Sequence, residues 1–230
     1  MTLLEHLEEL RRRIIVVVVC VLVGAAAGFL LAKPVFELLR APLPDQYDRL
    51  VFLTPTAAFA AQLKIAGFLG IGFAMPIILY NIWRFVTPGL TKRERGLVWP
   101  MIFGALVLFV AGIVAGYVLI PYALNFLLQF GTDLGLGDSL TIDGYIEFVT
   151  TMLLAFGIIF EFPIVLLALA RVHILNYRFL ASRRRYAVLI IVLISIVATP
   201  GGDPISPLLL SGVMYLLFEL TLFLIRLMRR

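Results

Sequence analysis

Cysteine and histidine are scarce in this chain of 230 residues, which contains one cysteine and two histidines. A single cysteine excludes an intrachain disulfide, and Cys20 lies inside an apolar segment, where we interpret it as a small packing residue. His6 and His173 flank apolar segments and have no metal-ligand partner at a workable spacing. We therefore expect neither a metal site nor a cofactor.

Catalytic motifs are also missing. The sequence contains no H-E-x-x-H, no G-x-S-x-G and no phosphate-binding P-loop. The turn that contains Gly201, Gly202 and Asp203 is faintly similar to a membrane aspartyl protease motif. Such an enzyme needs a second aspartate within a membrane helix, and no predicted helix here contains one. We therefore do not expect an enzyme.

Charge is sparse as well: 14% of the residues are charged and 62% are hydrophobic, whereas about a quarter of a soluble domain is charged. The apolar residues form continuous blocks, and about 20 such residues span a bilayer. Continuous blocks favour helices over a β-barrel, whose strands alternate. We predict an all-α polytopic membrane protein with six transmembrane helices in a single domain over residues 1–230, the helices being 14–32, 63–86, 97–120, 148–170, 186–199 and 208–225.

The basic residues predict the orientation. With the N-terminus in the cytoplasm, fifteen of the nineteen lysines and arginines fall on the cytoplasmic side, and only Lys33, Arg40, Arg49 and Lys64 fall outside. Such an imbalance is the positive-inside signal, and it accounts for the net charge of +5 without a nucleic-acid partner. We predict that both termini are cytoplasmic and that the protein resides in the bacterial inner membrane.

Length and proline predict the shape of the bundle. The 14 residues of 186–199 span only about 21 Å of a hydrocarbon core of about 30 Å, and we expect both 186–199 and 208–225 to be short helices. Pro76 and Pro163 predict kinks and a curved bundle. The long external connections, with a short amphipathic helix between Pro34 and Pro42, predict an external cap.

Glu161 is the acidic residue that lies deepest in an apolar block, between Phe160 and Phe162. An ionised carboxylate there costs several kcal/mol unless it is paired or hydrated. It is interpreted either as a protonated or internally bonded group that fixes helix packing, or as a site for transport, proton transfer or partner contact. Glu219 lies two turns from Arg226, and we interpret it as hydrated from the cytoplasmic side.

Two further carboxylates, Glu9 and Glu94, lie among basic residues at the cytoplasmic ends of the helices. Taken alone, they are interpreted as solvated charges or local ion pairs, which contribute little to stability.

Five strings of residues, in order over nearly the whole chain, resemble the TatC family, the signal-peptide receptors of the twin-arginine translocase. They are His6-Leu7-Glu8-Glu9-Leu10-Arg11; Ala41-Pro42-Leu43; Phe85-Val86-Thr87-Pro88-Gly89-Leu90 with Glu94; Ala155-Phe156-Gly157-Ile158-Ile159-Phe160-Glu161-Phe162-Pro163; and Thr199-Pro200 with Asp203.

The resemblance implies a receptor that binds Arg-Arg signal peptides and assembles with TatA and TatB, or with one TatA-like protein, to export folded proteins using the proton-motive force. It implies that Glu9 and Glu94 recognise the arginines, because carboxylates accept guanidinium groups bidentately. It makes Arg11, Phe85 and Pro88 further signal-peptide-binding candidates, Pro42 a structural loop residue, and Glu161 and Asp203 intramembrane polar or partner-contact residues. It also implies a homo-oligomer within a larger complex.

One departure from the family concerns the turn after the fifth block. Many relatives have Ser-Gln where this chain has Ser206-Pro207, so a partner contact that uses the glutamine is not expected to be retained. Two other functions stay open at this point: a proton-coupled small-solute transporter that uses Glu161, and a structural scaffold subunit that does not recognise cargo.

Overall fold

The computed structural model describes residues 3–43, 50–86, 96, 98–133, 140–171, 175–199 and 204–227. Within these ranges the regular secondary structure is helical, and there is no β-strand. Within the described ranges, five helical segments are long and apolar enough to cross a membrane, which confirms the all-α membrane fold. The chain divides into two compact units, Met1–Ala41 with Thr54–Leu106 and Pro42–Leu53 with Val107–Arg230. Whether these form a single domain stays a prediction.

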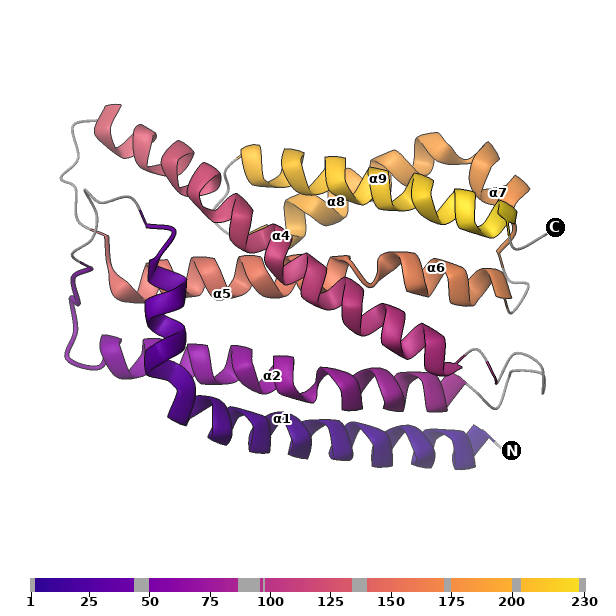
Figure 1. Cartoon of the computed structure of the whole chain (residues 1–230), viewed down its shortest axis with the longest axis horizontal. Coiled ribbons are helices and arrows are strands. Elements are labelled where there is room, and N and C mark those ends of the chain that lie inside the picture. Colours follow the sequence, from indigo (N-terminus) through magenta and orange to yellow (C-terminus); the bar gives the residue numbers. More distant parts are fainter. Residues whose placement is uncertain are drawn as a thin grey trace. The chain divides into compact units, whose positions relative to one another are not determined.

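The first unit contains α1 (Leu3–Arg40) and α2 (Ala57–Val86), which run antiparallel (Figure 1). α1 is longer than the apolar block 14–32 at both ends. The extension at its start is explained by the glutamate, leucine and arginine residues that precede the block, which are good helix formers. Pro34 lies inside α1, and the last part of the helix bends away from the first (Figure 1). The segment predicted as a separate amphipathic helix is therefore the bent end of α1.

Glycine allows α1 and α2 to approach closely. A Cβ atom added to Gly24 would lie 2.9 Å from the carbonyl oxygen of Gly70, and one added to Gly70 would lie 2.7 Å from the carbonyl oxygen of Val21. These distances are shorter than van der Waals contact, so neither position accepts a larger residue without a shift of the backbone. Small residues at such a crossing are typical of membrane helices, whose association depends on packing.

The remaining long helix, α4 (Val98–Asp133), begins in the first unit and continues in the second. The second unit adds α5 (Ile142–Ile159), α6 (Phe162–Arg171), α7 (Tyr177–Ser182), α8 (Arg184–Ala198) and α9 (Ile205–Leu227). Tight packing recurs between α4 and α5, where a Cβ atom on Gly112 would lie 2.5 Å from the carbonyl oxygen of Phe156.

The predicted helix 148–170 is interrupted at Phe160 and Glu161, which lie in a turn between α5 and α6. Pro163 explains the break, because proline has no amide hydrogen to donate to the carbonyl of residue 159, four positions earlier. The chain tightens there: the Glu161 amide donates to the Ile158 carbonyl at 3.1 Å, and the regular pattern resumes when Val165 donates to Glu161. The irregularity expected at Pro163 is thus a two-residue turn between α5 and α6.

The helices α8 and α9 differ in length. α8 has 15 residues, or about 22 Å, so the prediction of a short helix here is correct. α9 has 23 residues and is long enough to span a membrane, so the prediction of a short last helix is wrong. The difference arises because α9 starts at Ile205, before the apolar block, and continues through Arg226.

The two long connections meet within the second unit. The Val51 amide donates to the Leu140 carbonyl at 3.0 Å, and the Ile142 amide donates to the Val51 carbonyl at 2.9 Å. This isolated bridge fixes the connection after α1 to the start of α5.

Candidate functional site

The start of α1 and the end of α2 meet through an aromatic contact. The rings of His6 and Phe85 are stacked, with centroids 4.3 Å apart and an angle of 16° between the planes. Phe85, one of the predicted site residues, is therefore brought to the turn of α1 that precedes Glu9. His6 was assigned no role from the sequence.

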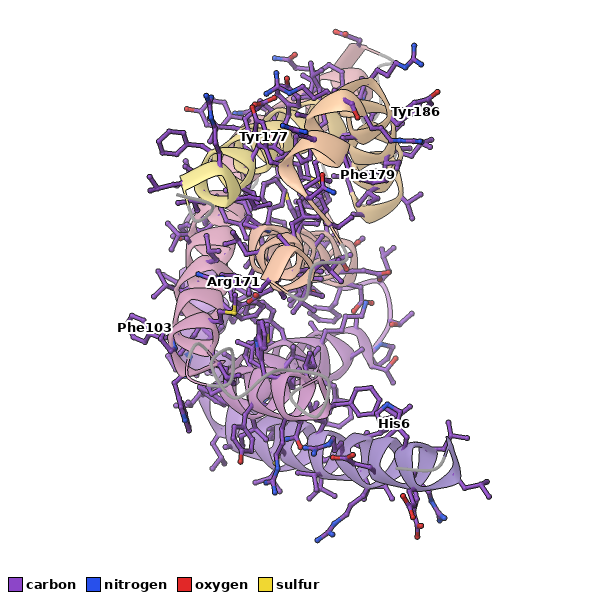
Figure 2. The ribbon with its side chains drawn as sticks, turned by 90° about the vertical axis from the view of Figure 1, so that its right-hand side faces the viewer. His6, Phe103, Arg171, Tyr177, Phe179 and Tyr186 are labelled. Carbon is purple, nitrogen blue, oxygen red and sulfur yellow. The ribbon has the colours of Figure 1, made fainter. Side chains whose placement is uncertain are left out.

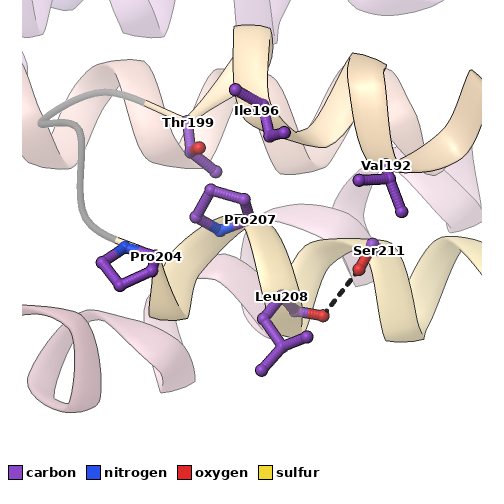
Figure 3. A pocket seen from close by; sticks show the side chains of 7 residues that line it. All are labelled: Val192, Ile196, Thr199, Pro204, Pro207, Leu208 and Ser211. Atoms are coloured by element: carbon purple, nitrogen blue, oxygen red, sulfur yellow. Dashed lines mark hydrogen bonds between the residues drawn. The ribbon is translucent and has the colours of Figure 1, made fainter.

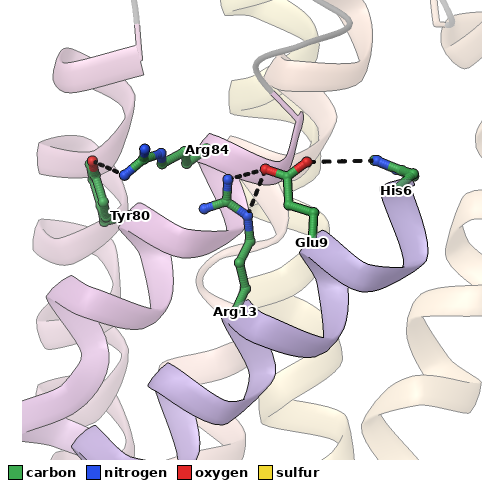
Figure 4. A network of polar contacts seen from close by, with 5 residues as sticks. All are labelled: His6, Glu9, Arg13, Tyr80 and Arg84. Carbon is green, nitrogen blue, oxygen red and sulfur yellow. Dashed lines mark hydrogen bonds and ion pairs between the residues drawn. The ribbon is translucent and has the colours of Figure 1, made fainter. Parts of the chain in front are cut away.

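Glu9 lies at the centre of a small polar network on this surface (Figure 4). Arg13, one turn further along α1, donates to Glu9 Oε1 through both Nε, at 3.1 Å, and Nη2. His6 Nδ1 lies 4.0 Å from the other carboxylate oxygen, Oε2. The spacing of four residues explains the pair, because residues i and i+4 of a helix share one face.

The two oxygens of Glu9 are therefore unequal. Oε1 accepts two hydrogen bonds from Arg13, whereas Oε2 is buried and has no hydrogen-bond partner in the described part of the chain. A buried carboxylate oxygen without a donor is costly, and the cost is relieved by any donor that reaches it. Glu9 is thus held in place and still has accepting capacity.

A second arginine near this surface is held separately. Arg84 donates to the Tyr80 hydroxyl at 3.2 Å and lies 5.8 Å above the Tyr80 ring (Figure 4). The Tyr80 ring in turn lies 6.1 Å from that of Trp99. Sequence reasoning missed Arg13, Tyr80 and Arg84, although the spacing of four residues within each pair was visible in the sequence.

The other predicted signal-peptide residues are not all brought together. Arg11 is exposed, and two residues along a helix from Glu9 correspond to about 200°, so it lies on the opposite face of α1. Pro42 lies in the turn that follows α1, where the Ala41 amide donates to the Leu38 carbonyl. Pro88, Glu94 and Asp203 lie outside the described residues.

Glu161 occupies the break between α5 and α6, where its Oε1 atom is buried and lacks a hydrogen-bond partner among the described residues. Its neighbour Phe160 is buried as well. The internally bonded interpretation of Glu161 therefore finds no donor for Oε1 in this part of the chain.

A pocket of about 370 Å³ lies between the end of α8 and the start of α9 (Figure 3). Its hydroxyl groups bond to the chain itself: Ser211 donates to the Leu208 carbonyl at 2.9 Å, and Thr199 donates to the Ser195 carbonyl at 2.9 Å. Pro207 lines it in place of a polar side chain. The pocket therefore offers mainly apolar surface.

In the described ranges, no group of three or more His, Cys, Asp or Glu side chains is close enough to hold a metal ion.

Comparison with known proteins identifies the family of this chain. The family model for the Sec-independent protein translocase protein (TatC) matches residues 5–212. The chain belongs to the TatC family.

Two bacterial TatC relatives match over nearly their full length. The chain is 41% identical to TatC of Carboxydothermus hydrogenoformans, covering 97% of this chain and 92% of the relative, and 38% identical to TatC of Aquifex aeolicus, covering 100% and 97%. A crystal structure of the twin-arginine translocase receptor TatC is 38% identical, with a TM-score of 0.84, and covers 98% of this chain and 100% of that one. The resemblance seen in the sequence is confirmed, and the chain is a membrane-embedded component of the protein-translocation machinery.

Proposed function

We propose that the chain is the signal-peptide receptor of a twin-arginine translocase and that Glu9, together with Glu94, accepts the two arginines of the signal peptide. The observation that supports the proposal is the unequal carboxylate of Glu9, in which Arg13 holds one oxygen and the buried Oε2 lacks a donor. An incoming guanidinium supplies that donor, and its planar fork fits a carboxylate in a way that a lysine ammonium does not reproduce.

The stack of His6 on Phe85 would bring a second helix, α2, to the receptor site. This stack fixes the end of α2 beside Glu9, and Pro88 and Glu94 follow α2 in the sequence. Two carboxylates from different parts of the chain would then recognise two adjacent arginines. The nearby Arg13 and Arg84 would disfavour peptides that are merely basic.

We further propose that Glu161 contacts a helix of TatA, TatB or a single TatA-like partner, because its buried oxygen lacks a donor in the described chain. The proposal extends to a homo-oligomer within a larger complex that exports folded proteins using the proton-motive force, with the chain acting as one domain. Both termini would lie in the cytoplasm, at the bacterial inner membrane.

The receptor proposal is tested by photo-crosslinking of a signal peptide that has a crosslinker next to its arginine pair. The wild-type chain should crosslink near Glu9, and the yield should fall about tenfold for Glu9→Gln or for a Lys-Lys peptide, because one charge-assisted hydrogen bond is lost. Glu8→Gln is the matched control, since Glu8 is an exposed neighbour. Equal yields for the Arg-Arg and Lys-Lys peptides would contradict the proposal.

A proton-coupled solute transporter that uses Glu161 is the rival function, since a carboxylate buried in a membrane segment also suits a proton site. The rival predicts pH-driven uptake of a small solute by the chain alone in liposomes, and the receptor predicts none. Uptake that disappears in Glu161→Gln would favour the transporter.

A further inference from the structure

Arginine and aromatic side chains alternate where α7, α8 and α9 meet. Arg183 lies 5.1 Å above the ring of Phe179, Arg185 lies 4.9 Å above that of Tyr186, and Arg226 lies 5.8 Å above that of Tyr177. Figure 2 shows the three rings at one end of the second unit. We call this the arginine–aromatic surface, defined by Tyr177, Arg178, Phe179, Arg183, Arg185, Tyr186 and Arg226.

The arginines of this surface outnumber the acidic residues of the described parts of α7, α8 and α9. Glu219 is the only acidic residue within 175–199 and 204–227, and it accepts hydrogen bonds from Arg184 at 3.0 Å and from the Tyr215 hydroxyl at 3.0 Å. Arg178, Arg183 and Arg185 are exposed. The surface therefore attracts an anion from outside the protein.

The surface also continues into an apolar stripe. Arg185 is followed at intervals of four residues by Leu189, Leu193 and Val197, which form a stripe that winds around α8 by about 40° per step and are 57%, 54% and 87% exposed. A guanidinium group followed along the helix by aliphatic side chains suits a ligand that has an anionic headgroup and a long apolar tail.

The helix α8 is too short to reach the headgroups of both leaflets unless the bilayer becomes thinner around it. Its 15 residues span about 22 Å, less than the hydrocarbon core of about 30 Å. Phe179 and Tyr186 are 46% and 47% exposed, and tyrosine is enriched at membrane–water interfaces, where arginine side chains also extend to the headgroups. A lipid phosphate bound to Arg183 and Arg185 would make the bilayer locally thinner, so that its thickness matches the length of α8.

We propose that the arginine–aromatic surface is a binding site for the headgroup of an anionic phospholipid, with the acyl chain lying along Leu189, Leu193 and Val197. The guanidinium groups of Arg183 and Arg185 donate to the phosphate, and the rings beneath them keep these groups in position. This site shares no residue with the proposed receptor site at Glu9, and the proposal does not depend on that site.

Native mass spectrometry of the purified chain, titrated with phosphatidylglycerol or phosphatidylcholine, tests the proposal. The wild-type chain should retain phosphatidylglycerol preferentially, and Arg183→Gln with Arg185→Gln should weaken its binding by roughly fivefold per arginine. The control removes two positive charges from exposed positions on α1, Arg12→Gln with Lys33→Gln, and should preserve the tight site.

A second variant guards against misfolding. Arg183→Lys with Arg185→Lys keeps the charge and loses the planar group, so it should bind phosphatidylglycerol more weakly than the wild type and more tightly than the glutamine variant. Equal retention of both lipids, an unchanged affinity in the glutamine variant, or displacement of the lipid by inorganic phosphate would overturn the proposal. Binding of a polyglutamate peptide without a lipid preference would also contradict it and indicate an acidic protein partner.

Discussion

The two carboxylate oxygens of Glu9 differ in their hydrogen bonds: Oε1 accepts two from Arg13, and Oε2 has no donor among the described residues. Arg13 bonds to Oε1 and prevents the side chain from turning away, while Oε2 is enclosed near His6 at 4.0 Å. A carboxylate that is already oriented loses less conformational freedom when a ligand binds. In the proposed receptor site, Arg13 would therefore act mainly by orienting Glu9 before the ligand binds, although Arg13 was not among the predicted site residues.

Substitutions of Glu161 can distinguish a role in helix packing from a role in contacting a partner. Glu161→Gln keeps a carbonyl acceptor at the position of the buried oxygen, whereas Glu161→Leu removes it. We expect Glu161→Leu to abolish co-purification of a TatA-like partner and Glu161→Gln to retain part of it, while both leave the crosslinking of a signal peptide near Glu9 unchanged. Normal export by the leucine variant would return Glu161 to a packing role.

At the scale of elements, the apolar blocks predicted which segments are helical, since any lipid-exposed segment must bond its own backbone groups. They did not predict the ends of α1, which extends into charged residues outside the apolar block 14–32. Pro163 marked the region of a break, but the turn at Phe160 and Glu161 is visible only in the hydrogen bonds.

Contacts between elements were less accessible to sequence reasoning. The pair Glu9 and Arg13 follows from the helical period, whereas the stack of His6 on Phe85 depends on how α1 and α2 align. The close glycine crossing sets that alignment, and a single sequence does not reveal which glycines face each other.

Gly70 tests the importance of the crossing between α1 and α2. A Cβ atom there would lie 2.7 Å from the Val21 carbonyl oxygen and 2.8 Å from the Ala25 amide nitrogen, whereas one on Gly72 meets nothing within 4 Å. We expect Gly70→Val to lower the free energy of unfolding by about 1–3 kcal/mol, measured by SDS-induced unfolding from a mild detergent. Gly72→Val is the matched control, and equal destabilisation by both would contradict the close-packing argument.

At the scale of the whole molecule, the distribution of lysine and arginine is the basis for the proposed orientation. The single native cysteine makes a direct measurement possible. In a Cys20→Ser background, a cysteine at the exposed position 8 should react with a membrane-impermeant maleimide only in inverted vesicles. A cysteine at position 52, where Phe52 is 68% exposed, should react in intact spheroplasts. The reverse pattern would contradict cytoplasmic termini.

The receptor account makes the whole molecule a docking platform: the signal peptide would bind where α1 begins and α2 ends, and a partner helix at the break between α5 and α6. Both proposed contacts use a carboxylate with one buried oxygen that lacks a donor within the described chain. The receptor proposal depends on the first contact, in which Glu9 accepts an arginine of the signal peptide.

A double-mutant cycle tests that claim most directly. The affinity of a signal peptide, with and without one arginine replaced by glutamine, is measured for the wild-type chain and for Glu9→Gln. If the two groups bond to each other, each single change should weaken binding about tenfold, and the combined change should weaken it by much less than the product of the two. Fully additive losses for both arginines would show that Glu9 contacts neither and would contradict the account.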